Sequence, residues 1–160
     1  MAALLERPIP GPSSTSMESR ASQTTTAAVI AWCSILAGAL SGLIMGLWSF
    51  DGPMPTPDWI GAYDALPRRF LRLAHVAMFA LGVLHFLVAR QIAATPIRPD
   101  VDRLALAAMA LGNISMPAVL IAAAFWQPLK YLTSITALAV TTAIAIAALS
   151  AIRPHRRHPK

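Results

Sequence analysis

Two histidines stand inside a long apolar stretch of the chain. His75 and His85 lie ten residues apart in a segment that begins with Arg68, Arg69 and Arg72. Ionisable side chains are costly inside a membrane, so they mark candidate functional sites by default. Ten residues at 100° each place the two imidazoles roughly 80° apart around a helix. Both can therefore point into a helix bundle, at different depths.

A b-type haem is one cofactor that would suit this pattern. His75 would be the axial ligand of the haem iron, and Arg68 or Arg72 would pair with the propionates. Met45 or Met116 could approach at a similar depth and supply the sixth ligand. The analogy with four-helix di-haem cytochromes is one of architecture only. Those proteins carry histidines on more than one helix, whereas the remaining two histidines here follow the last apolar run.

The same residues can be explained without a cofactor. Three arginines at a helix N-terminus oppose the helix dipole and call for nearby negative charge, and Asp51, Asp58 and Asp64 precede them. Asp64 and Arg68 are four residues apart, the spacing of a helix ion pair. The histidines would then hydrogen-bond to neighbouring helices. A third alternative is a small carrier that holds an anionic ligand on Arg72.

Small residues repeat along the first apolar run, at Gly38, Gly42 and Gly46. Residues four apart share one helix face, and close backbone approach is what brings helices together in lipid. The repeat predicts helix packing, with a flat cofactor against the backbone as the alternative.

Asn113 and Pro117 form a polar break in the third apolar run. Proline removes the hydrogen bond to the carbonyl four residues earlier, here that of Asn113. The pair predicts a kink, and the Asn113 amide is expected to hydrogen-bond between helices.

Four apolar runs must position these residues, each long enough to cross about 30 Å of hydrocarbon. They cover residues 27–48, 70–89, 104–126 and 131–152. The runs are continuous rather than alternating, which argues against membrane strands. The last two are so close in sequence that they must form an antiparallel hairpin. The sequence predicts an all-α, antiparallel four-helix transmembrane bundle.

Polar segments flank the runs. Residues 1–26 are rich in Pro, Ser and Thr and are predicted to form a disordered tail, and residues 153–160 form a basic tail. In the loop between the first two runs, four apolar residues could form one face of a short interfacial helix. These are Trp59, Ile60, Tyr63 and Leu66.

The basic residues are distributed unevenly. Nine Lys or Arg residues lie on the side of the two termini and four on the opposite side. Because cytoplasmic segments carry the excess of positive charge, both termini are predicted to be cytoplasmic, in a bacterial inner membrane.

The composition of the 160-residue chain agrees with a membrane protein. Hydrophobic residues make up 56% and charged residues 12%, about half the roughly 25% usual in soluble domains. This excludes an ordinary soluble domain, and the net charge of +6 reflects topology rather than nucleic-acid binding. The sequence holds no phosphate loop, CxxC pair or zinc-protease motif, so no residue set points to catalysis. We predict a non-catalytic subunit or assembly component of a larger membrane complex, in contact with lipid and with a membrane-protein partner or a second copy.

Overall fold

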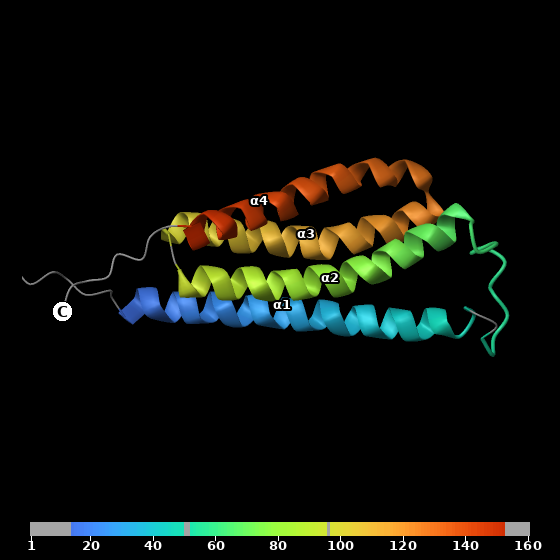
Figure 1. Ribbon diagram of the computed structural model, residues 1–160, viewed down its shortest axis with the longest axis horizontal. Coiled ribbons are helices and arrows are strands. Elements are labelled where there is room, and N and C mark those ends of the chain that lie inside the picture. Colours follow the sequence, from blue (N-terminus) through green and yellow to red (C-terminus); the bar gives the residue numbers. More distant parts are fainter. Residues whose placement is uncertain (1–13, 50–51, 96, 153–160) are drawn as a thin grey trace, which may run out of the picture.

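Four long helices make up most of the chain. The computed structural model describes residues 14–49, 52–95 and 97–152. Within these residues all the regular secondary structure is helical, with no β-strand (Figure 1). All four helices are long and apolar enough to cross a membrane. The predicted all-α four-helix transmembrane bundle is confirmed.

The helices extend beyond the apolar runs at several ends. They are α1 (Ser14–Gly46), α2 (Leu66–Ala94), α3 (Pro99–Phe125) and α4 (Thr133–Ile152), with a short 3-10 helix, η1 (Gln127–Leu132), before α4. Both α2 and α3 have a proline in the first turn, where its missing N–H costs nothing and its fixed φ suits a helix. These prolines start each helix several residues before its apolar run.

The N-terminal boundary differs from the expectation of a disordered tail over residues 1–26. Residues 14–26 belong to α1, whereas residues 1–13 lie outside the described part of the chain, as do residues 153–160 of the basic tail. Nucleation is the costly step of helix formation, and extending a formed helix is not. The polar segment after Pro12 contains no further proline, so it can continue the apolar helix; the stretch with membrane-spanning character begins at Ser22.

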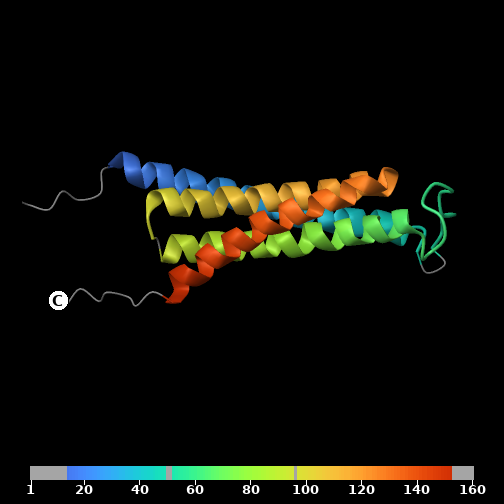
Figure 2. The ribbon, with the colours of Figure 1, turned by 90° about the horizontal axis from the view of Figure 1, so that it is seen from above.

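The helices are antiparallel, and α2 and α3 form the central pair. Helix α1 packs on α2 and α4 packs on α3, so that α1 and α4 lie on opposite sides (Figures 1 and 2). The beginning of α1, the end of α2, the beginning of α3 and the end of α4 share one end of the bundle (Figure 1). The loop between α1 and α2 and the turn before α4 share the other. We call these the terminal end and the loop end.

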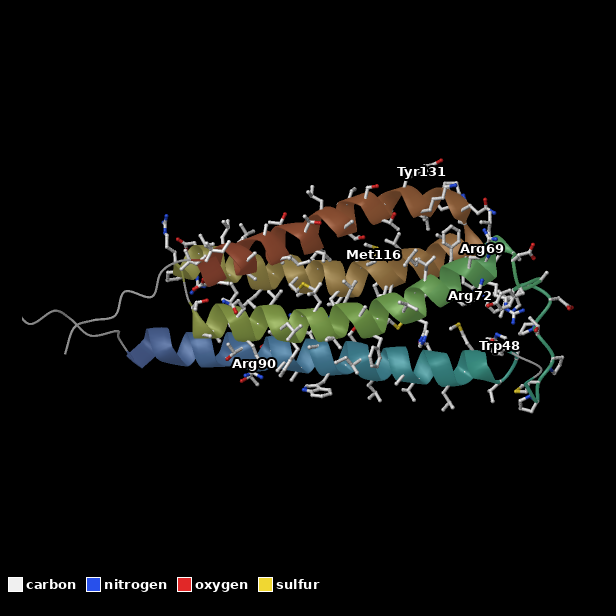
Figure 3. All side chains as sticks on the ribbon, in the orientation of Figure 1. Trp48, Arg69, Arg72, Arg90, Met116 and Tyr131 are labelled. Atoms are coloured by element: carbon white, nitrogen blue, oxygen red, sulfur yellow. The ribbon has the colours of Figure 1, made fainter. Side chains whose placement is uncertain are left out.

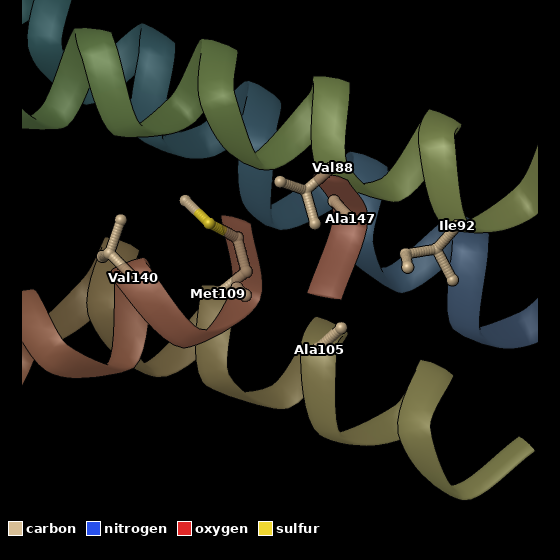
Figure 4. Packing of buried hydrophobic residues seen from close by; sticks show 7 residues of the cluster. Val88, Ile92, Ala105, Met109, Val140 and Ala147 are labelled. Carbon is tan, nitrogen blue, oxygen red and sulfur yellow. The ribbon is translucent and has the colours of Figure 1, made fainter. Parts of the chain in front are cut away.

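A core of alanine, branched aliphatic and methionine side chains fills the space between α2, α3 and α4 (Figure 4). Its buried members are Val88, Ile92, Ala105, Met109, Val140, Ala143 and Ala147. Gly112 lets α3 approach α4 closely: a Cβ there would lie 3.3 Å from the backbone nitrogen of Val140 and would overlap the Val140 side chain. Small residues at such contacts are how membrane helices gain dispersion energy.

Large apolar side chains are exposed on the outer surface of the bundle. Examples are Leu43 on α1, Val76 on α2, Leu111 on α3 and Leu138 on α4. A soluble monomer rarely exposes so much contiguous apolar surface, whereas a helix that spans a membrane presents apolar side chains to the lipid. The exposed residues support contact with the lipid bilayer.

The long loop contradicts one prediction. Residues 52–65 form turns rather than a short helix, because Gly61 takes a positive φ of 75° that a helix does not contain. Ile60 is 1% exposed and lies inside the loop end. The Trp59 ring stacks on Phe125 at the end of α3, with ring centroids 5.2 Å apart. The loop therefore packs onto the bundle through single side chains and not through an amphipathic face.

Candidate functional site

Three polar side chains from three helices meet inside the bundle. Asn113 of α3 lies between His85 of α2 and Ser34 of α1: its amide nitrogen is 3.2 Å from His85 Nδ1 and its amide oxygen 2.8 Å from Ser34 Oγ. His85 is 0% exposed and Asn113 is 1% exposed. Ser34 Oγ also lies 2.9 Å from the Met78 carbonyl oxygen, to which it can donate. We call Ser34, Asn113 and His85 the polar triad.

The triad uses only one of the two ring nitrogens of His85. If the Asn113 amide nitrogen donates to Nδ1, the ring hydrogen stands on Nε2. The Asn113 amide group can also take the opposite orientation, with its oxygen and nitrogen exchanged, because the two atoms occupy nearly the same space. Nδ1 then donates to the amide oxygen and Nε2 carries a lone pair. Both orientations leave Nε2 without a partner.

His85 Nε2 is a buried nitrogen without a hydrogen-bond partner in the described part of the chain. Leaving a buried polar atom unpaired costs about 1–3 kcal/mol, so such an atom in a packed structure calls for an explanation. His85 lines a cavity of about 340 Å³ between α1 and α3. That volume falls within the range of about 300–1,000 Å³ typical of small-molecule sites. We call it the His85 cavity.

The His85 cavity is polar at one end and apolar along its walls. Its apolar lining comes from α1 and α3, and includes Ile30, Leu106 and Ala110. The polar lining residues are Ser22, Gln23 and Thr26 of α1 and Arg103 of α3. Arg103 is exposed near the start of α3, at the terminal end. The cavity therefore has a cationic mouth and a buried imidazole.

A second hollow continues along the same α1–α3 face. It has a volume of about 380 Å³, is lined by Ser34, Asn113 and Pro117 among mainly apolar side chains, and shares Ile30 with the His85 cavity. Helix α3 runs through Pro117 without interruption. The polar triad stands between the two hollows.

His75 occupies a different place from His85. Its Nδ1 lies 2.8 Å from the Gly38 carbonyl oxygen and 3.2 Å from Ser41 Oγ, both on α1. A Cβ on Gly42 would lie only 2.5 Å from His75 Cε1 and 3.2 Å from Nε2. The imidazole itself thus fills the groove of small residues, and this arrangement supports a role of His75 in helix packing.

The three glycines of α1 have different surroundings. A Cβ on Gly38 would lie 2.9 Å from the Phe79 backbone nitrogen of α2, and Gly42 faces His75. Gly46 has no atom within 4 Å of that position. Two of the three glycines therefore lie at the closest approach of α1 and α2, and Gly46 does not.

The arginines at the start of α2 are held by the loop. Arg72 lies over the Tyr63 ring, 4.1 Å from its centroid, and its Nη2 donates to the Tyr63 carbonyl at 3.1 Å. Arg68 lies 5.2 Å from the same centroid and donates to the Trp48 carbonyl at 3.3 Å. Figure 3 shows Arg69, Arg72 and Trp48 together at the loop end.

The expected ion pair between Asp64 and Arg68 is not formed. Among the side chains that the structure describes, those of residues 22–49, 52–95 and 97–152, the one ion pair joins Arg98 and Asp100 at 4.0 Å. The prediction was wrong because the residues before Leu66 leave the helix, so that the spacing of four residues no longer places Asp64 beside Arg68. The Tyr63 ring and backbone carbonyls take the place of the carboxylate.

Met116 faces α4. Its sulfur accepts a hydrogen bond from Thr136 Oγ1 at 3.1 Å, and Figure 3 shows it between α3 and α4. The other residues proposed for a haem site each have contacts of their own: His75 with α1, Arg68 and Arg72 with the loop. A haem site on these residues stays a prediction from the sequence.

Sequence reasoning singled out His85 and Asn113 but did not join them, and it counted Arg103 only for orientation. The sequence carried little signal for this contact, because the predicted runs place His85 about 6 Å and Asn113 about 14 Å from the same end of the bundle. In the described residues no group of three or more His, Cys, Asp or Glu side chains could hold a metal ion.

Comparison of the chain with protein-family models, with curated proteins and with solved structures gives no match. The geometry of the polar triad and its cavity is therefore the basis for a functional proposal.

Proposed function

We propose that this multi-pass membrane protein is a non-catalytic binding component that holds a small amphipathic anion in the His85 cavity. The observation that carries the proposal is the ligand-sized His85 cavity, which has the exposed Arg103 at one end and the buried His85 among its lining residues. The anionic end of the ligand would lie at Arg103, and its apolar body would lie along Ile30, Leu106 and Ala110.

Polar contacts must supply the selectivity of such a site. A molecule that leaves the bilayer for the cavity exchanges one apolar environment for another, so the hydrophobic effect contributes little. Arg103 at the mouth supplies a guanidinium with five donors in a geometry that suits a carboxylate. Arg72, the residue that the sequence suggested for an anionic ligand, already donates to Tyr63.

We further propose that the terminal end faces the cytoplasm of a bacterial cell, with the protein in the inner membrane. The basic residues at that end include Arg90, Arg98 and Arg103, and the excess of Lys and Arg over the whole chain favours the same orientation. The mouth of the cavity would then open at the cytoplasmic leaflet. Membership of a larger membrane complex, or pairing with a second copy, stays a prediction from the sequence.

Ligand binding can be measured on the full chain in nanodiscs of zwitterionic lipid, with tritiated dodecanoic acid as the probe. We expect saturable binding that Arg103→Gln weakens by up to about fivefold, the equivalent of about 1 kcal/mol for an exposed charge pair. Arg98→Gln is the matched control, because Arg98 lies at the same end, pairs with Asp100 and does not line the cavity. Absence of saturable binding, or equal losses in the two variants, would refute the proposal.

A further inference from the structure

We infer that the amphipathic anion is an anionic phospholipid of the leaflet at the terminal end, with its phosphate at Arg103 and one acyl chain between α1 and α3. This inference rests on the proposed function and names the class of its ligand. The surface that would hold the lipid consists of the His85 cavity and the second hollow, which follow one another along the same face and share Ile30. We call this surface the α1–α3 groove.

The first support is that the α1–α3 groove opens sideways onto the bilayer. Helix α1 packs mainly on α2 rather than on α3, which leaves the groove between α1 and α3. Exposed residues line it on both helices: Val29 and Ala37 on α1, and Ala107, Ile114 and Ala118 on α3. A lipid can therefore enter from within its own leaflet while its headgroup stays at the membrane surface, and its second acyl chain can remain in the bilayer.

The second support is that the groove changes from polar to apolar with depth, as a phospholipid does. Its polar lining residues near the terminal end are Ser22, Gln23, Thr26 and Arg103. The polar residues that line it deeper in the bundle belong to the polar triad, and the remaining lining there is mainly apolar. A polar headgroup at that depth would lose its hydrogen bonds to water without gaining others. The headgroup therefore belongs at the terminal end and the acyl chain belongs along the rest of the groove.

The third support is the charge at the mouth of the groove. Arg103 is cationic, and none of the described residues that line the two hollows is acidic. The neighbouring Asp102 is 7% exposed, and its carboxylate accepts a hydrogen bond from the Ile97 N–H at 3.1 Å. Arg103 forms no ion pair with the side chains of residues 22–49, 52–95 and 97–152. A guanidinium binds a phosphate through paired hydrogen bonds, so Arg103 is free to hold the phosphate of a lipid.

The fourth support is the length of the groove. The His85 cavity runs from Ser22 to Ile30 on α1, about 12 Å, and from Arg103 to Ala110 on α3, about 10 Å. The second hollow extends the groove along α3 as far as Ile121. One leaflet contributes half of a hydrocarbon core of about 30 Å. A groove that begins beside Arg103 therefore accommodates an acyl chain over the whole depth of its leaflet.

The test is native mass spectrometry of the full chain, released from nanodiscs that contain equal amounts of phosphatidylglycerol and phosphatidylcholine with the same acyl chains. We expect adducts of phosphatidylglycerol to exceed those of phosphatidylcholine by about fivefold, the preference that one arginine at the membrane surface gives an anionic lipid. Arg103→Gln should remove most of this excess. Arg98→Gln is the matched control and should keep it, because Arg98 lies at the same end, pairs with Asp100 and does not line the groove.

A second pair of variants tests the position of the acyl chain. Ala107→Trp adds a ring to an exposed residue that lines the groove, whereas Leu111→Trp adds one to an exposed residue of α3 outside its lining. The first should lose the excess of phosphatidylglycerol and the second should keep it.

Equal adducts of the two lipids on the unaltered protein, or the same excess in all four variants, would overturn the inference. The proposed function would still stand if dodecanoic acid bound saturably in nanodiscs of zwitterionic lipid. Absence of that binding as well would overturn both.

Discussion

Replacing Gly42 by leucine should separate α1 from α2 at their closest contact. A Cβ at this position would lie 2.5 Å from His75 Cε1 and 3.2 Å from each ring nitrogen, so the imidazole must leave the groove. Moving it breaks the 2.8 Å hydrogen bond from Nδ1 to the Gly38 carbonyl. Overpacking costs about 1–3 kcal/mol and a lost hydrogen bond about 0.5–1.5 kcal/mol. The expected loss in the free energy of unfolding is about 2–4 kcal/mol.

Unfolding by sodium dodecyl sulfate in mixed micelles, followed by circular dichroism, measures this loss. Gly46→Leu is the control, because it adds the same side chain one turn further along α1, where a Cβ meets nothing within 4 Å. Its effect should stay within about 0.5 kcal/mol. If the two variants lose equal stability, Gly42 has no special place in the packing of α1 on α2. If neither loses stability, the position of His75 in the groove is wrong.

Two further substitutions test the contacts of α3, each by the same unfolding measurement. Gly112→Leu should cost about 1–3 kcal/mol by overlap with Val140, and adding Val140→Ala should recover part of that loss; no recovery would contradict the close contact of α3 and α4. Asn113→Leu should cost about 1–3 kcal/mol, because it leaves His85 Nδ1 buried and unpaired. Ser115→Ala, which removes only a local hydrogen bond to Leu111, should cost far less, and an equal cost would count against the polar triad.

The fold could be predicted from the sequence because each span is an uninterrupted apolar run of sufficient length. Lipid leaves a backbone few alternatives to a helix, since every N–H and C=O must be satisfied within the segment. The helix ends could not be predicted from hydropathy. They depend on backbone hydrogen bonds that continue past the apolar part, as in residues 14–26 of α1, and on first-turn prolines such as Pro99 of α3.

The site could be predicted only in part, because it depends on how neighbouring helices are rotated. His85 and Asn113 could be singled out because polar side chains are unusual inside a membrane. A single sequence, however, does not show which buried polar residues face each other. Arg68 and Arg72 suggested an anion because the sequence does not show that Tyr63 would cover them. That contact depends on a loop whose path includes the positive φ of Gly61.

Photolabelling tests the central claim, that the cavity ending at His85 holds an amphipathic anion. Dodecanoic acid with a terminal diazirine would be bound to the full chain in nanodiscs, irradiated and located by mass spectrometry. Labels concentrated near Ile30 and Ala110, and displaced by excess unlabelled acid, are the predicted result. Labels spread over lipid-facing residues such as Leu43 and Leu138, with no displacement, would contradict it.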